Sequence, residues 1–315
     1  MRLPVQVLIF LFVSLAFISS VAQHVPSAGN DQLGIAGGDH DHHRATGPGK
    51  ASPRYDHHPH KVGSHGSRRA FGMTRSSRKP FGANTLAVRQ TQCEPAGGMA
   101  TQYWDCCKVA GAWSGYKSVN GTAHSCAKDG VTLLEDPNVT SGCQGGTAFA
   151  CNNHQPFVSA TNPKLAYAVG ARPAPLGLDN YIGACYSIQF EELPGKTLVF
   201  QAVNTGNYPT NKQIDIQTPG GGVGELNTCP SQWNSPPDGW GRRYGGILNR
   251  SQCDQLPAQL QPGCHWRYDW LAPSDHPDGI NPTIASMCRV KCPTILTDLT
   301  GVSRFDDASF PEPPQ

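Results

Sequence analysis

All twelve cysteines of this 315-residue chain lie between Cys93 and Cys292, and this confinement limits the possible folds more than any other feature. An even number of cysteines in one region is typical of disulfide bonds in an exported protein. Zinc binding is the alternative, but Cys288 and Cys292 have no second cysteine pair or neighbouring histidine to complete a site. We therefore expect a disulfide-stapled domain over residues 93–315.

The first 22 residues are typical of a secretory signal peptide. Arg2 supplies the positive end, residues 5–17 are apolar, and Ser20 and Ala22 are small residues suited to cleavage. A membrane anchor is the alternative, but the apolar run is shorter than the roughly 20 residues that cross a bilayer. We expect a secreted, extracellular protein without membrane contact after cleavage. Three Asn-X-Ser/Thr motifs are potential glycosylation sites, at Asn120, Asn138 and Asn249.

Residues 23–92 differ in composition from the rest. They are rich in Gly, Ser, His, Arg and Pro, and they hold eight of the twelve histidines. A segment with so few apolar residues cannot bury enough surface to offset the entropy lost on ordering. We interpret it as a disordered linker or pro-segment. A metal-binding or pH-sensitive tail is the alternative that the histidines raise.

Residues 93–315 carry fourteen Lys/Arg and nineteen Asp/Glu. This balance argues against a nucleic-acid partner, because phosphates are bound by positive charge. Short β-rich runs at 184–190, 197–203 and 213–218 are separated by Gly, Pro and Asn clusters, as in all-β proteins. A short helix is expected after Ser251. The sequence predicts a mostly β, monomeric domain with long loops and a few short helices.

Asp215 lies in the last of these strands. Strict alternation puts Ile214 and Ile216 on one face and Asp215 on the other, with Gln213 and Gln217. The glycines that follow permit a tight turn and the close approach of a ligand. A solvated surface aspartate is the alternative reading.

Asp105 lies in a second extended stretch, over residues 101–107. Alternation there puts Tyr103 and Asp105 on one side, and Trp104 and Cys106 on the other. A carboxylate beside a flat aromatic face suits a sugar-binding cleft. Here too a solvated surface position is the alternative.

Residues 100–108 (ATQYWDCCK) resemble the N-terminal signature of glycoside hydrolase family 45 endoglucanases. Several separated motifs in the same order are more specific than any one of them. The further matches are 141–143 (SGC), 184–186 (ACY), Asp215 followed by 219–224 (PGGGVG), 243–247 (RYGGI), 262–270 (PGCHWRYDW), 305–307 (FDD) and 310–311 (FP). The resemblance covers about residues 99–311.

The resemblance implies a six-stranded double-psi β-barrel that hydrolyses internal β-1,4-glucosidic bonds of cellulose with inversion, without metal or cofactor. By the match, Asp105 corresponds to the general base and Asp215 to the general acid. The base must stay ionised to accept a proton from water, and the acid must hold a proton for the leaving oxygen. Single-step inversion needs the two carboxyl groups about 6.5–9.5 Å apart. Asp215 is then expected in the more enclosed position, with a raised pKa.

Sugar rings stack on aromatic faces, and the match makes Tyr103 and Trp113 the best substrate-binding candidates, with Tyr244 and Lys108 as further ones. A core position is the alternative for Trp113. Three other aromatic residues alternate along the chain and are expected to pack inside on one face: Trp266, Tyr268 and Trp270.

Two positions depart from the family pattern. Gln102 stands where the signature usually has Arg, which changes the support around Asp105. Near 207–208, where many relatives carry an additional assisting Asp, this chain has Asn207 and Tyr208. Asn207 is expected to hydrogen-bond the site without carrying charge, so the departure concerns the rate more than the mechanism.

The cysteines test the resemblance independently. Many relatives have paired cysteines where this chain has Gly111 with Ile182 and Gly183 with Val302, and both members of each pair are missing here. The remaining family-like pairs are Cys106–Cys229, Cys107–Cys143, Cys126–Cys151, Cys185–Cys292 and Cys253–Cys264. They leave Cys93 and Cys288, which we predict to join each other.

Two other functions stay open from the sequence. One is a non-hydrolytic, expansin-like wall-loosening or carbohydrate-binding protein, which shares the barrel and an aspartate like Asp215 but lacks the base. The other is a barwin-like defence protein, which the signature around Asp105 disfavours. Asp105 together with Asp215 favours a secreted glycoside hydrolase whose partner is a β-1,4-glucan such as cellulose.

Overall fold

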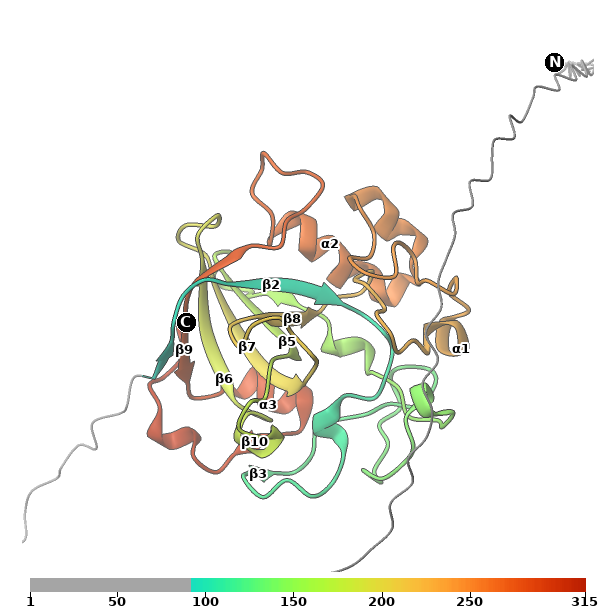
Figure 1. The fold of residues 1–315 in the computed structure, drawn as a ribbon, viewed down its shortest axis with the longest axis horizontal. Coiled ribbons are helices and arrows are strands. Elements are labelled where there is room, and N and C mark those ends of the chain that lie inside the picture. Colours follow the sequence, from blue (N-terminus) through green and yellow to red (C-terminus); the bar gives the residue numbers. More distant parts are fainter. Residues whose placement is uncertain (1–91) are drawn as a thin grey trace, which may run out of the picture. The chain divides into compact units, whose positions relative to one another are not determined.

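The computed structural model describes residues 92–315, and Figure 1 shows their fold. The predicted signal peptide over residues 1–22, and all of the predicted linker over residues 23–92 except Gln92, lie outside the described residues. Within residues 92–315, no helix combines the length and apolar character that crossing a bilayer requires.

Strands dominate this part of the chain, and its helices are short. The strands are β1 (Cys93–Glu94), β2 (Gly98–Tyr103), β3 (Val119–Asn120), β4 (Phe157–Val158), β5 (Leu165–Ala171), β6 (Cys185–Phe190), β7 (Thr197–Asn204), β8 (Ile214–Gln217), β9 (Thr283–Val290) and β10 (Ser303–Arg304). The helices are α1 (Cys229–Trp233), α2 (Gln261–Asp269) and α3 (Thr294–Thr300). The three expected β-rich runs are β6, β7 and β8, and the helix expected after Ser251 is a 3₁₀ helix at Arg250–Gln255.

Six of the strands close into a barrel. Its order is β9-β2-β8-β5-β7-β6, and β6 pairs with β9 to complete the ring. Two neighbouring pairs are parallel, β2 with β8 and β5 with β7, and the other pairs are antiparallel. The expectation of a mostly β, six-stranded barrel is confirmed.

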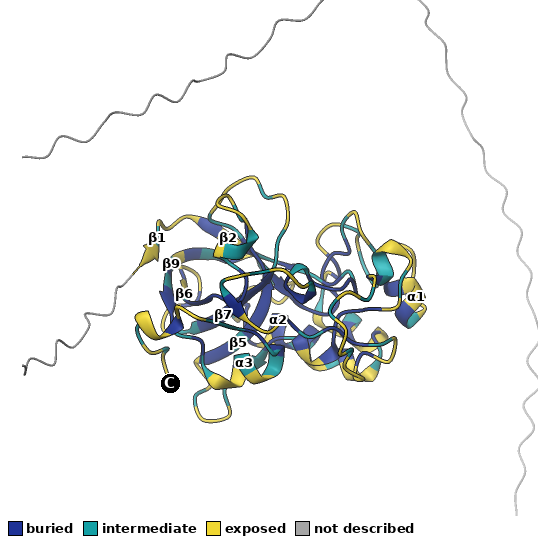
Figure 2. Ribbon diagram, turned by 90° about the horizontal axis from the view of Figure 1, so that it is seen from below, coloured by how far each residue is buried: buried dark blue, intermediate teal, exposed yellow. Residues whose placement is uncertain are grey.

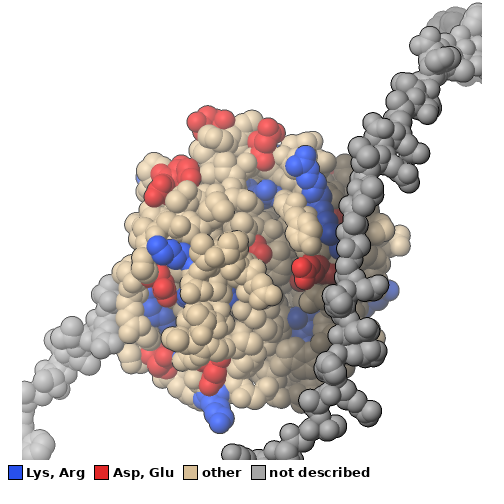
Figure 3. Space-filling view, in the orientation of Figure 1, with Lys and Arg blue, Asp and Glu red and all other residues tan. Residues whose placement is uncertain are grey.

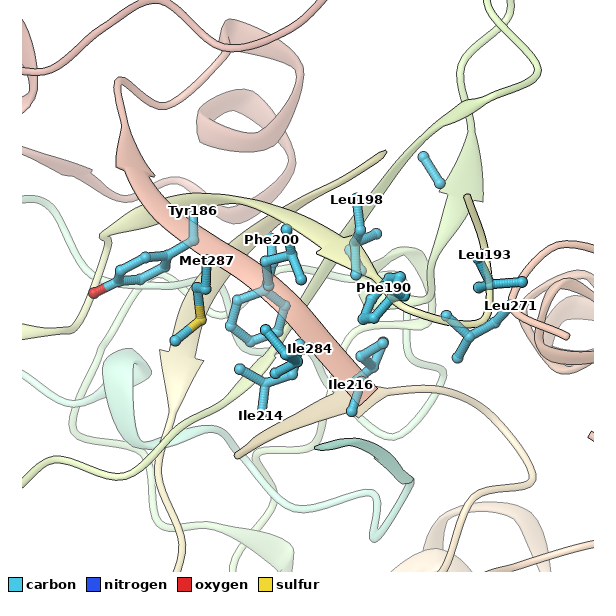
Figure 4. Packing of buried hydrophobic residues seen from close by; sticks show 14 of the residues in the cluster. Tyr186, Phe190, Leu193, Leu198, Phe200, Ile214, Ile216, Leu271, Ile284 and Met287 are labelled. Carbon is cyan, nitrogen blue, oxygen red and sulfur yellow. The ribbon is translucent and has the colours of Figure 1, made fainter. Parts of the chain in front are cut away.

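The barrel interior is apolar because alternate residues of its strands point inward. Figure 4 shows side chains of β6, β7, β8 and β9 converging, among them Phe200, Ile214 and Ile284. Figure 2 shows the barrel strands buried and the exposed residues concentrated in the connecting loops. Along β8, Ile214 and Ile216 are fully buried while Asp215 between them is half-buried, as alternation predicts. Gln217, expected on the face of Asp215, is buried as well.

The aromatic residues near the C-terminal end are buried as expected, but not on one face of an extended chain. They lie on and just after α2, where a helical repeat replaces the alternation. Trp266 and Trp270, four residues apart, stack with ring centroids 5.3 Å apart and pack on the barrel core. Tyr268 points to a second cluster with Trp104 and Ile247. The prediction of a single face was therefore wrong.

All six predicted disulfides are confirmed: Cys93–Cys288, Cys106–Cys229, Cys107–Cys143, Cys126–Cys151, Cys185–Cys292 and Cys253–Cys264. The positions of the missing family cysteines are also adjacent in space. A Cβ atom added at Gly111 would lie 3.0 Å from Ile182 Cγ2, and one added at Gly183 would lie 3.4 Å from Val302 Cγ2. Apolar packing thus replaces a covalent link at both places.

Candidate active site

A groove with a cavity volume of about 540 Å³ opens beside β2 and β8. Its walls come from the ends of these strands and from three loops, at residues 204–209, 222–226 and 243–245. Five of the seven predicted site residues line it: Tyr103, Asp105, Asn207, Asp215 and Tyr244. Residues more than 100 positions apart in the chain therefore meet in one place.

Asp105 follows β2 and is held by covalent and hydrogen bonds on its C-terminal side. The next two residues form disulfides with two separate short helices, Cys106 with Cys229 at the start of α1 and Cys107 with Cys143 in a 3₁₀ helix. The backbone N–H of Cys107 donates to Asp105 Oδ1 at 2.9 Å, and the N–H of Thr228 donates to the Asp105 carbonyl at 3.0 Å. The carboxylate therefore has a fixed direction relative to the barrel.

Asp215 lies within β8, between β2 and β5. In the parallel ladder it is in register with Thr101, whose hydroxyl lies 2.9 Å from Asp215 Oδ1. The same hydroxyl lies 3.2 Å from the Ile214 carbonyl, to which it can donate instead. Thr101 is therefore able to donate to an ionised Asp215 and to accept from a protonated one.

The glycines after β8 form a turn closed by Gly221 N–H donating to the Thr218 carbonyl, and they also allow close packing within the chain. A Cβ at Gly221 would lie 2.7 Å from Tyr103 Cα, and one at Gly222 would lie 2.7 Å from the Gly245 backbone nitrogen. These glycines let the loop pack against the backbone of β2 and of the 243–245 loop. The close approach is thus between parts of the chain itself, and it builds one wall of the groove.

Burial dominates the electrostatics of both carboxyl groups. It raises the pKa of Asp105 to about 7, with a further increase from the charge of Asp215 and opposing hydrogen bonds from backbone N–H groups. It also raises the pKa of Asp215 to about 7, opposed by the hydrogen bond from Thr101. Enclosure alone therefore does not distinguish an acid from a base here, contrary to the expectation that Asp215 is the more enclosed. Both groups exchange protons near neutral pH.

Lys108 and Trp113 lie together but do not line the groove. The Lys108 ammonium is 3.5 Å from the centroid of the Trp113 ring, and it donates to the carbonyls of Pro137 and Val139 at 2.6 and 2.9 Å. Lys108 is buried and Trp113 is half-buried. Their contact ties the chain after Asp105 to the 137–139 loop, and their role toward a substrate stays a prediction.

The two departures from the family pattern have clear positions. Gln102 is buried and its amide nitrogen donates to the Ala100 carbonyl at 2.9 Å, so the amide turns back along β2 rather than toward Asp105. Asn207 is exposed on the groove wall, and within residues 92–315 it makes no hydrogen bond to either carboxylate. Asn207 therefore lines the groove as expected, but it does not make the expected hydrogen bond to the carboxylates.

Three groove residues were missed as functional candidates: Thr101, Asn204 and Tyr208. Tyr208 is the half-buried member of an otherwise exposed stretch, residues 206–211. Burial, followed by the charges of Asp215 and Asp105, raises its pKa, so the phenol stays neutral. Thr101 had a readable signal, since it stands two residues before Tyr103 on the same side of β2. Asn204 ends β7, and Tyr208 lies in the loop that follows, whose path local patterns do not define.

Known proteins resemble the part of the chain that carries this groove. Residues 97–303 match glycosyl hydrolase family 45. An endoglucanase of Cryptopygus antarcticus is 39% identical over 203 residues, which are 64% of this chain and 86% of that protein. A putative endoglucanase type K of Fusarium oxysporum is 39% identical over 218 residues, 68% of this chain, and the match spans only 55% of that protein.

A solved structure extends the agreement to the fold. The crystal structure of a cellulase from the Antarctic springtail, Cryptopygus antarcticus, matches with a TM-score of 0.61 at 38% identity, covering 67% of this chain and 98% of that one. The family match covers more than half of the chain, and it contains both groove aspartates and the strands that carry them. The chain belongs to glycosyl hydrolase family 45.

Proposed function

We propose that this protein is a secreted endo-β-1,4-glucanase that hydrolyses internal bonds of cellulose by single-step inversion. The observation that carries the proposal is that Asp105, just after β2, and Asp215, within β8, line one groove and both have a pKa raised to about 7. Two carboxyl groups that exchange protons near neutral pH are what acid and base catalysis of this reaction needs.

Asp105 acts as the general base. Its carboxylate accepts a hydrogen bond from the Cys107 backbone N–H, which stabilises the ionised form and leaves its other oxygen for a water molecule. The water gives a proton to Asp105 while its oxygen attacks the anomeric carbon. The two adjacent disulfides hold the backbone next to Asp105, and with it the Cys107 N–H that contacts the carboxylate.

Asp215 acts as the general acid. The half-buried carboxyl has only the Thr101 hydroxyl as a hydrogen-bond partner within residues 92–315. Since Thr101 can donate to the Ile214 carbonyl instead, the protonated form of Asp215 is also accommodated. Asp215 gives its proton to the glycosidic oxygen as the bond to the anomeric carbon breaks.

The groove suits a neutral sugar chain. Tyr103 and Tyr244 supply aromatic faces for stacking, and Tyr244 is 67% exposed at the groove edge, where a long polymer can reach it. Asn207 and Tyr208 add polar groups for sugar hydroxyls. Figure 3 shows that, on the face drawn, charged residues form small separate groups on a mostly uncharged surface.

Product analysis on a soluble cellulose derivative and on cellohexaose tests the proposal. We expect a rapid fall in viscosity from internal cleavage, and the α-anomer as the first product by NMR. Release of the β-anomer would contradict the inverting mechanism. Binding without any reducing-sugar release would favour the expansin-like alternative.

The secreted location is supported by the six disulfides, because such bonds persist in oxidising compartments. Secretion by an expressing host cell, with mature protein that begins after residue 22, is the matching test. Retention of the first 22 residues on the secreted protein would contradict the signal peptide.

A further inference from the structure

Asn204, at the end of β7, makes two hydrogen bonds that fix the orientation of its side-chain amide. The backbone N–H of Ala110 donates to Asn204 Oδ1 at 2.9 Å, and Asn204 Nδ2 donates to the Tyr103 hydroxyl oxygen at 3.0 Å. A backbone N–H can only donate, so the amide oxygen must face Ala110 and the amide nitrogen must face Tyr103. Reversing the amide would set the Ala110 N–H against the amide NH₂ group, so that two donors would face each other.

This arrangement determines where the hydroxyl hydrogen of Tyr103 points. A phenol has one hydrogen, and because the amide nitrogen of Asn204 only donates, that hydrogen must be directed elsewhere. Within residues 92–315 the Tyr103 hydroxyl has no second hydrogen-bond partner. Tyr103 lines the groove beside Asp105, so its O–H group is available to donate to a ligand in the groove.

The hydroxyl also keeps its hydrogen under working conditions. Burial, followed by the neighbouring charge of Asp105, raises the pKa of Tyr103 well above its usual value. The Ala110 N–H that holds Asn204 belongs to a segment whose neighbouring residues, Val109 and Ala112, pack against Val203 of β7. A Cβ at Gly111 would lie 2.8 Å from the Val203 carbonyl, which shows how closely this segment packs on β7.

We infer that Asn204 is a positioning residue that holds the Tyr103 hydroxyl as a hydrogen-bond donor to an oxygen of the glucan bound next to Asp105. The inference rests on the proposed function for its ligand. Glucans offer hydroxyl and ether oxygens as acceptors, and the Asp105 carboxylate receives its hydrogen bond from the Cys107 backbone instead. Asn204 does not touch the substrate in this role, and it acts only through Tyr103.

A double-mutant cycle tests this dependence. Asn204→Ala frees the Tyr103 hydroxyl to rotate, and Tyr103→Phe removes it. Each single variant is expected to lower kcat/KM on cellohexaose about tenfold or more, as when one hydrogen bond to a bound ligand is lost. Because both changes remove the same donor, the double variant is expected to match Tyr103→Phe alone to within about twofold.

Tyr116→Phe is the matched control. It removes a hydrogen bond to the same residue, Ala110, but on the carbonyl side and away from Tyr103 and the groove. We expect its kcat/KM to stay within about twofold of the wild type. All variants are assayed below their thermal unfolding midpoints, so that loss of folded protein does not enter the comparison.

The outcomes separate the inference from the proposed function. If Asn204→Ala costs as much in the Tyr103→Phe background as in the wild type, or costs nothing in the wild type, the inference is overturned. A wild type that binds cellohexaose without cleaving it refutes the hydrolase. In that case the Kd of cellohexaose is measured by calorimetry for the same set of variants. The double variant is again expected to match Tyr103→Phe alone. A wild type that neither binds nor cleaves cellohexaose overturns both.

Discussion

The Thr101 hydroxyl and the Asp215 carboxylate face each other across two parallel strands, 2.9 Å apart and in register. The contact exists because β2 and β8, separated by more than 100 residues, run side by side in the barrel. The β2–β8 pairing within the barrel thus also places the hydroxyl that lowers the pKa of Asp215 against the effect of burial.

Replacing Thr101 with Val tests this relationship. The hydrogen bond from Thr101 lowers the pKa of Asp215 against the larger effect of burial, so its removal raises that pKa further above about 7. An acid works in its protonated form, and the alkaline limb of the pH–rate profile is therefore expected to move up by roughly 0.5–1 pH unit. Thr101→Ser keeps the hydroxyl and should leave the limb unchanged. A downward shift in Thr101→Val would contradict the assignment of Asp215 as the acid.

The roles of the two aspartates can be distinguished by changing the leaving group of the substrate. Asp105→Asn and Asp215→Asn are each expected to lower turnover of cellulose by at least about 10³-fold, while cellohexaose binding persists. On a cello-oligosaccharyl fluoride, whose leaving group needs no proton, Asp215→Asn should regain most of its activity and Asp105→Asn should not. Recovery by Asp105→Asn instead would reverse the two roles.

The same carboxyl groups make stability depend on pH. The pKa of Asp215 rises from 3.8 to about 7 on folding, so the folded state binds its proton more tightly than the unfolded chain. The resulting stabilisation is complete below about pH 4 and is lost as the pH rises through about 7. Asp215→Asn, which carries no charge, is therefore expected to raise the free energy of unfolding at pH 8 by about 1–3 kcal/mol and to have little effect at pH 4.

Urea unfolding at both pH values measures this difference. Asp129→Asn is a control in which the pKa shift has the opposite direction. Hydrogen bonds from Thr132 and from the Val131 backbone lower the pKa of the exposed Asp129. That variant should be less stable than the wild type at pH 8. Equal stability of Asp215→Asn and the wild type at pH 8 would show that Asp215 is not held in an unfavourable charged state.

The Cys93–Cys288 disulfide is expected to contribute stability and not activity. It joins β1 to β9, and neither cysteine lines the groove. Replacing both with Ser should cost about 2–4 kcal/mol, because a long loop of the unfolded chain is no longer closed. The thermal midpoint should fall by roughly 5–15 °C with kcat unchanged. A large loss of kcat in folded protein would show that β1 supports the groove.

Much of the site was readable from the sequence because its signals are local. Alternation in β8 placed Asp215 opposite Ile214 and Ile216, and alternation after Thr101 placed Tyr103 and Asp105 on one side. The order of the motifs led to the family, and from it to the barrel and all six disulfides. Alternation can be read locally because side chains in a strand repeat every two residues. The disulfides join residues up to 195 positions apart, so their pairing came from the resemblance and, for Cys93–Cys288, from the two cysteines left over.

Other features were decided only by the tertiary structure. Trp266, Tyr268 and Trp270 alternate as in a strand, yet they lie on and after a helix that packs them into two clusters. The end of β7 brings Asn204 to the groove and the loop after it brings Tyr208, whereas Lys108 turns away to Trp113 and the 137–139 carbonyls. The sequence by itself determined the candidate residues, Asp105 and Asp215 among them. The barrel decided which of them meet and how enclosed they are, because closing a ring of strands joins segments that no local pattern connects.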